Sequence, residues 1–137
     1  MGKAFESEQI TMSCYNTMTT TIQPYHFVKL SCTATQVHSV RLPSTALSAP
    51  TLGISQEAIN PSTYGRIAIS GISRLKVGST AMTMVVTTAN HVAANASGHG
   101  IRVAATTTYT QATQLSNAAA SDITAVILTP MCAKRKI

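Results

Sequence analysis

The feature that most constrains this chain is a series of short β-prone runs, which turn-forming residues interrupt roughly every 8 to 15 positions. The clearest run is 66–74, where Ile67 and Ile69 alternate with small or polar residues. This period of two is typical of a strand with one buried face. Roughly seven or eight such runs, with at most one or two short helical turns, predict an all-β fold: a small single-domain β-barrel or sandwich.

Composition divides the chain into three parts. Residues 1–24 are polar, rich in Thr and Met, and show no sustained period, so we expect an extended N-terminal arm or an edge strand outside the core. Residues 25–129 carry the strand-like runs and are expected to form the domain, and 130–137 a basic C-terminal tail that starts at Pro130. At 137 residues the chain is expected to support one hydrophobic core.

The middle of the chain is loosely echoed near its C-terminal end. Thr51–Ile59 leads through a turn into Arg66–Ile69, and Thr113–Ala119 leads through a short polar turn into Ile123–Val126. Both segments have the pattern of a strand, an alanine-containing kink, a turn and a second strand. The pattern indicates that the β-units are arranged pseudo-symmetrically.

The charge is basic but dispersed. Ten Lys and Arg residues against four Asp and Glu give a formal charge of +6, and the only cluster is Lys134, Arg135 and Lys136. Basic arms that bind nucleic acid are usually longer than this cluster. Surfaces that bind single strands interleave aromatic with basic residues, and this sequence has no such pattern. We therefore expect no nucleic-acid partner, and a charge suited to docking onto an acidic protein surface.

Cysteines and histidines are the residues that could bind metal or act as nucleophiles. They are Cys14, Cys32, Cys132, His26, His38, His91 and His99. The cysteines are odd in number, widely spaced and without a CxxC motif, which indicates reduced thiols. No histidine lies two or four positions from another ligand-type residue, and His91 and His99 flank a loop where we expect them to be exposed. The spacing thus predicts no metal site, and a pair of Cys32 with His38 would lack a recognisable nucleophile motif.

Acids that could serve catalysis are few. Glu57, between an apolar run and a turn, is the one that merits attention, and we expect it to pair with Arg66 or Arg74 rather than to act as a catalyst. The sequence contains no GxGxxG, GxxxxGK, GxSxG or HExxH motif. We therefore expect a protein that is not an enzyme and that has no cofactor and no small-molecule substrate.

The N-terminal region lacks the pattern of a secretory signal. Lys3 is followed by Glu6 and Glu8, and no apolar segment comes after them. Nor does the chain contain a run of about 18 apolar residues that could span a membrane. We expect the protein to be made in the cytoplasm and to have no membrane partner.

Three segments carry a resemblance to a known family. Gly53–Ala58, then Tyr64–Ile72, then Val77 and Gly78 resemble the small bacteriophage capsid decoration (head cement) proteins, which have a Gly-Val-Ala-x-Glu-Ala stretch and a Gly-containing turn into a strand. In those proteins a second such unit follows, here Gln111–Leu128, although Thr113–Ala118 lacks the Gly and Glu. The resemblance implies a compact β-barrel or β-tulip, a homotrimer, and a place on the outside of the virion head, where it clamps neighbouring major capsid protein subunits.

If the chain is a decoration protein, it has candidate contacts with the capsid or with a sister subunit. They are Glu57, Arg66, Arg74, Tyr15, Tyr25, Lys134, Arg135 and Lys136. Other readings remain open: another small virion protein, such as a tail-tube, head-completion or coat protein, or a ligand-binding β-module. A sugar-binding module is disfavoured because sugar sites usually stack on aromatic faces and Trp is absent. A hydrolase built on Cys32 is the most distant alternative.

Overall fold

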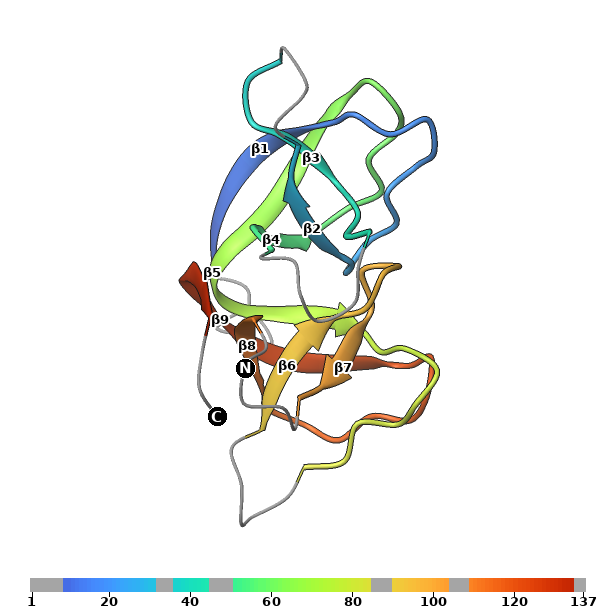
Figure 1. Cartoon of the computed structure of the whole chain (residues 1–137), viewed down its shortest axis with the longest axis vertical. Helices are drawn as coiled ribbons and strands as arrows, with labels where there is room; N and C mark the ends of the chain where they lie inside the picture. The colour runs from blue at the N-terminus through green and yellow to red at the C-terminus, as the bar shows by residue number, and fades with distance from the viewer. Residues whose placement is uncertain (1–8, 32–35, 45–50, 85–89, 104–108, 135–137) are drawn as a thin grey trace.

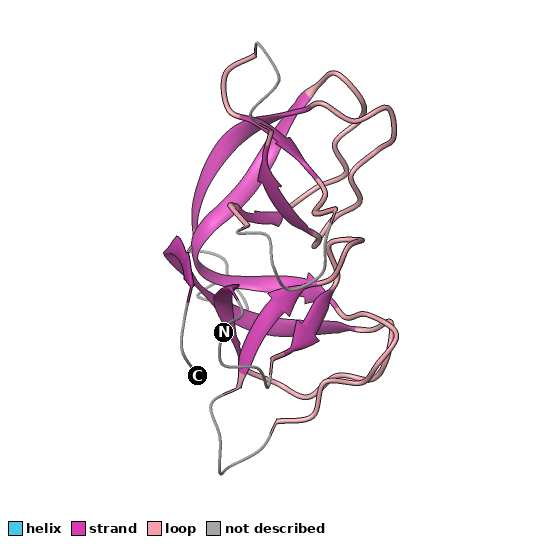
Figure 2. Cartoon of the chain, in the orientation of Figure 1, coloured by secondary structure: helices cyan, strands magenta, loops and turns pink. Residues whose placement is uncertain are grey.

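The computed structural model describes residues 9–31, 36–44, 51–84, 90–103 and 109–134, and within these ranges all regular structure is β (Figure 2). The strands are β1 (Ile10–Asn16), β2 (Phe27–Leu30), β3 (Ser39–Arg41), β4 (Gly53–Ser55), β5 (Tyr64–Lys76), β6 (His91–Ala94), β7 (Gly100–Arg102), β8 (Tyr109–Gln114) and β9 (Ile123–Lys134). The prediction of an all-β barrel protein is confirmed.

The first five strands form a closed ring. Their order is β1-β3-β2-β4-β5, and β1 also pairs with β5, which closes the barrel. The β1–β3 pairing is parallel, whereas β1 with β5, β2 with β3, β2 with β4 and β4 with β5 are antiparallel. This first barrel uses the N-terminal half of β5, and Figure 1 shows it as the upper half of the molecule.

The second half of β5 belongs to another ring. From Gly71 onward β5 pairs with β9, and the order continues through β8 and β6 to β7. A parallel bridge between Val77 and Gly100 then joins β7 to the residue that follows β5. This second barrel is the lower half in Figure 1, so β5 runs through both barrels.

The two barrels repeat the same pairing register. In the first, Thr11 lies opposite Ala68, and the ladder continues to Tyr15 opposite Tyr64. In the second, the corresponding ladder runs from Ile72 opposite Ile127 to Lys76 opposite Ile123. The strands therefore correspond one to one. The counterparts of β1, β3, β2 and β4 are, in that order, the second half of β5, β7, β6 and β8, and the counterpart of the first half of β5 is β9.

The turns that precede the closing strands match as well. The first contains Ser62 at φ 60° and the second Ser121 at φ 62°, a left-handed conformation that is uncommon outside glycine. Each turn follows an antiparallel bridge, Ile22 with Ile59 in one barrel and Met82 with Ala118 in the other. The pseudo-symmetry indicated by the sequence is thus present in the backbone.

Two clusters of buried apolar side chains fill the molecule, where the chain length predicted one core. The smaller cluster lies in the first barrel and includes Cys14, Ile22 and Ile67. The larger fills the second barrel but also takes in Phe27 and Ile54 from the first. Because the larger cluster crosses the junction, burial of apolar area joins the two barrels.

The expectation of an N-terminal arm over 1–24 does not describe Ile10–Asn16, which is a strand of the first barrel. Cys14, Asn16 and Ile22 are fully buried. The Asn16 amide donates to the carbonyls of Ile59 at 2.8 Å and Thr20 at 3.0 Å, so a polar residue occupies the interior without an unmet hydrogen bond. A segment that looked too polar for the core therefore closes the barrel.

The expected C-terminal tail also begins later than predicted. β9 continues through Pro130 to Lys134, where Lys134 pairs with Tyr109 of β8. The register between β8 and β9 shifts between Thr110 and Ala112, so Pro130 falls where the regular ladder is interrupted. A proline, which has no N–H to donate, is tolerated at such an irregularity.

Gly53→Ala tests the close approach of β4 to β5. A methyl group there would collide with the carbonyl oxygen of Ala68 and lie 2.9 Å from the Ile67 side chain. We expect the free energy of unfolding to fall by about 2–3 kcal/mol, as overpacking of a core does. Urea denaturation followed by circular dichroism measures it.

The control is Thr80→Ala on an exposed bend, which is expected to change stability by less than about 0.5 kcal/mol. A Gly53→Ala protein as stable as the wild type would contradict this packing of β4 on β5.

A candidate docking surface

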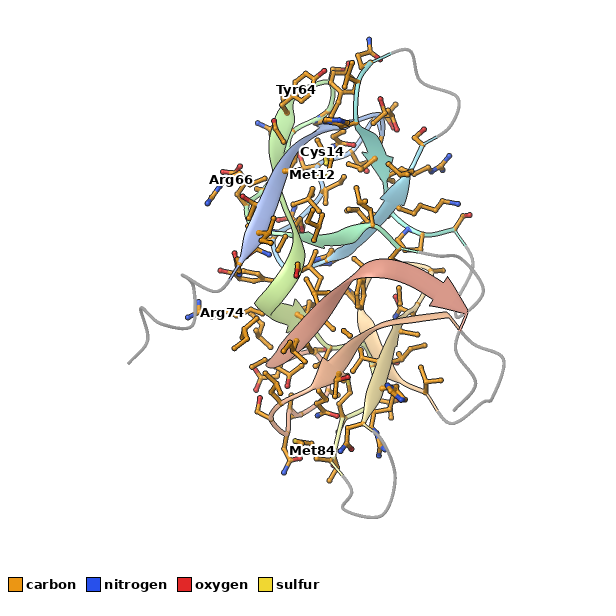
Figure 3. The ribbon with its side chains drawn as sticks, turned by 90° about the vertical axis from the view of Figure 1, so that its left-hand side faces the viewer. Met12, Cys14, Tyr64, Arg66, Arg74 and Met84 are labelled. Carbon is orange, nitrogen blue, oxygen red and sulfur yellow. The ribbon has the colours of Figure 1, made fainter. Side chains whose placement is uncertain are left out.

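The outer face of β5 brings together residues that the sequence singled out. Tyr64, Arg66 and Arg74 are exposed residues of β5 and lie along the same side of the molecule in Figure 3. Tyr15 lies opposite Tyr64 on the neighbouring strand β1. We call the outward-facing residues of the β1–β5 and β5–β9 ladders the β5 face.

On the first barrel the β5 face is polar and aromatic. The Glu57 carboxylate accepts the backbone N–H of Arg66 at 2.9 Å, and its Oε2 lies 3.7 Å from the Arg66 Nε. The predicted pairing of Glu57 with Arg66 is thus present. Both side chains are largely exposed, 62% for Arg66 and 44% for Glu57, so the pair contributes little to stability. The rings of Tyr15 and Tyr64 meet edge to face with their centroids 5.2 Å apart.

On the second barrel the β5 face is basic and apolar. Arg74 lies opposite Ala125, with Ile127 and Ile123 on either side of that alanine along β9. The two isoleucines are 41% and 44% exposed. Within the described ranges Arg74 has no carboxylate partner. This half of the face therefore presents an unpaired cation between exposed apolar side chains.

The two arginines lie at corresponding positions of the repeated strand pairs. Ser13 opposite Arg66 in the first barrel matches Arg74 opposite Ala125 in the second. Each barrel thus carries one exposed arginine at the same position along its outer ladder. Arg66 is on the second strand of its pair and Arg74 on the first. The sequence predicted both residues as contacts but had no means of showing this correspondence.

The remaining predicted contacts fall elsewhere. Tyr25 is half-buried, has φ 66° and packs against the larger core cluster. Lys134 ends β9, and Arg135 and Lys136 lie outside the described residues.

The structure pairs two histidines that the sequence did not associate. The Nε2 atoms of His26 and His99 lie 3.0 Å apart, although 73 positions separate the residues. His99 was expected to be exposed and is partly buried. Burial lowers the pKa of both imidazoles, and the nearby Lys76 ammonium lowers them further; for His99 the neighbouring His26 contributes as well. No local pattern signals this pair, because the fold alone brings the two segments together.

Cys14 is a free cysteine and is buried. Burial raises the pKa of the Cys14 thiol to about 11, so it is protonated at neutral pH. Among the residues that the structure covers, no group of three or more His, Cys, Asp or Glu side chains gathers in a way that could hold a metal ion. Cys32, proposed as the nucleophile of a distant alternative, lies outside these residues. None of the described segments forms a helix that could cross a membrane.

Comparisons with known proteins identify the fold. No family model matches the sequence, and no curated protein matches it either. Among solved structures, the chain is similar to the N base of head fiber gp8.5 of bacteriophage phi29, with a TM-score of 0.63 at 5% sequence identity. The similarity covers 92% of this chain and 98% of that one, so it includes both barrels. The fold of this chain is thus similar to that of a bacteriophage head protein, in line with the resemblance of its sequence to capsid decoration proteins.

The His26–His99 pair makes stability depend on pH. Because the folded state holds both pKa values below those of the unfolded chain, the unfolded chain binds more protons as the pH falls below about 6.5. We expect stability to fall as the pH drops from 7.5 and to level off once the folded-state imidazoles are also protonated. Urea denaturation at a series of pH values, with EDTA present, measures this.

The His99→Gln variant is expected to show a smaller loss between pH 7.5 and 5 than the wild type. His91→Gln, on the same hairpin, serves as the matched control and should keep the wild-type pH dependence. Identical profiles for wild type and His99→Gln would show that the pair does not govern it.

Proposed function

We propose that this chain is a structural protein of a bacteriophage head, and more specifically a decoration (cement) protein. In this role it binds the outer surface of the capsid and stabilises the contacts between major capsid protein subunits. It works by adhesion, and needs no cofactor, nucleic acid or small-molecule substrate. The observation that carries the proposal is the fold shared with a phage head fiber base over nearly the full length of both chains.

The β5 face supports a docking role. It combines Arg74, which lacks a carboxylate partner in the described ranges, with exposed apolar side chains such as Ile123 and Ile127. Arginines and apolar side chains are typical of the centre of protein interfaces, whereas lysines and acids are depleted there. Its charge is complementary to an acidic protein surface.

The duplication supports attachment to a repetitive lattice. One chain presents two similarly built outer ladders, each with one arginine, Arg66 and Arg74. Two weak contacts on one rigid body reinforce each other, because the second forms at a high effective concentration once the first is made. A capsid, which repeats the same subunit surface many times, offers such paired targets.

Association into a homotrimer is part of the proposal. Closed symmetric oligomers are the usual form of small structural subunits, and a trimer on a three-fold position of the head would multiply the contacts of each β5 face. Light scattering of the purified protein is expected to give three times the mass of the chain.

Co-sedimentation with purified, expanded phage heads tests the docking surface. Arg66→Ala and Arg74→Ala are each expected to weaken binding at least about fivefold, equivalent to about 1 kcal/mol, and the double variant more. Binding by the wild type should weaken as salt is raised, since exposed charges are screened. Circular dichroism checks that each variant remains folded.

Arg41→Ala is the matched control, since Arg41 is exposed on β3 and removing it changes the net charge equally. If it weakens binding as much as Arg74→Ala, net charge rather than the β5 face governs attachment. A monomer that does not sediment with heads would overturn the proposed function, and spontaneous assembly into rings or shells would favour a tail-tube or coat protein.

A further inference from the structure

The His26–His99 pair lies at the junction of the two barrels. His26 directly precedes β2 of the first barrel, and His99 lies in the hairpin that joins β6 and β7 of the second. Beside them, the Phe27 N–H donates to the Gly98 carbonyl at 2.7 Å. Gly98 has φ 82°, and an added methyl group would lie 2.7 Å from the Phe27 carbonyl oxygen, so this approach depends on glycine. The backbone thus holds the two imidazoles in place.

Hydrogen bonding orients the His26 ring. Its Nδ1 lies 2.9 Å from the Pro24 carbonyl oxygen, which can only accept a hydrogen bond, so Nδ1 carries the proton of the neutral ring. Nε2 is then the nitrogen with the free lone pair, and it faces His99. An imidazole held by a backbone carbonyl in this way is the usual arrangement of a metal-binding histidine.

The ring positions allow both Nε2 atoms to converge on a common point. A straight N–H···N hydrogen bond between the two Nε2 atoms would place the ring centroids more than about 5 Å apart. The centroids are 4.7 Å apart at a nitrogen separation of 3.0 Å, and the ring planes are inclined by 62°. If both rings point symmetrically at one position, it lies about 2 Å from each nitrogen, which is the length of a bond from imidazole to zinc.

We propose that His26 and His99 bind one divalent transition-metal ion between the two barrels. Imidazole suits Cu²⁺, Ni²⁺ and Zn²⁺, and the proposed ion is of this class rather than Mg²⁺ or Ca²⁺, which prefer oxygen ligands. Water completes the coordination, since both histidines are only partly buried. The bound ion links the segment before β2 to the β6–β7 hairpin and so stabilises the junction of the barrels.

Isothermal titration calorimetry of the metal-free protein with NiCl₂ and ZnCl₂ tests the site. Cu²⁺ is avoided because the thiols of the chain can reduce it. One saturable site per chain is expected, and His26→Ala or His99→Ala should weaken it by about tenfold or more. At a hundredfold excess over Kd, the ion should raise the wild-type Tm by about 5–10 °C and leave that of His99→Ala nearly unchanged.

His91→Ala is the matched control, because His91 lies on β6 of the same hairpin and should retain wild-type affinity. Where an alanine variant does not fold, His99→Gln and His26→Gln replace it. Absence of saturable binding by the wild type would overturn the proposal, as would equal affinity in the His99 variants. Neither result bears on capsid docking, since the residues changed in the docking test, Arg66 and Arg74, are not ligands of the proposed ion.

Discussion

The structure depends on one strand that belongs to two barrels. The first half of β5 closes the first ring and its second half opens the next, so neither ring is complete without it. Gly71, at φ 93°, lies where the strand passes from one ring to the other. Arg66 and Arg74, one on each side of this point, are both exposed on β5. The shared strand and the core cluster that crosses the junction join the two rings.

The two barrels share the same backbone arrangement but differ in their outward-facing side chains. Interior positions of the matching ladders stay buried, for example Ile67 and its counterpart Val126. The outer positions differ, since Tyr64 corresponds to Ile123 and Ser13 to Arg74. Burial constrains what an inward position tolerates, whereas a solvent-facing position can be adapted to a partner at little cost in stability.

Buried polar side chains brace the small rings at matching places. Ser55 donates to the carbonyl of Gln23 and Gln114 to that of Met82, in both cases at 2.7 Å. These bonds connect β4 and β8 to the segments that form the isolated bridges, near Ile22 in the first barrel and at Met82 in the second. In a chain with only 4% aromatic residues and a thin apolar core, these donated hydrogen bonds help fix the geometry of each ring, although the buried Oε1 of Gln114 has no partner among the described residues.

The sequence by itself determined the β class, the central strand through its period of two, the pairing of Glu57 with one of two arginines, Arg66 or Arg74, and the echo between the two halves. Each of these depends on neighbours along the chain or on a visible repeat. Only the tertiary structure decided that the polar segment 10–16 closes a barrel, and that His26 meets His99. Ring closure joins residues far apart in sequence, and whether a polar side chain can be buried depends on partners that local pattern does not reveal.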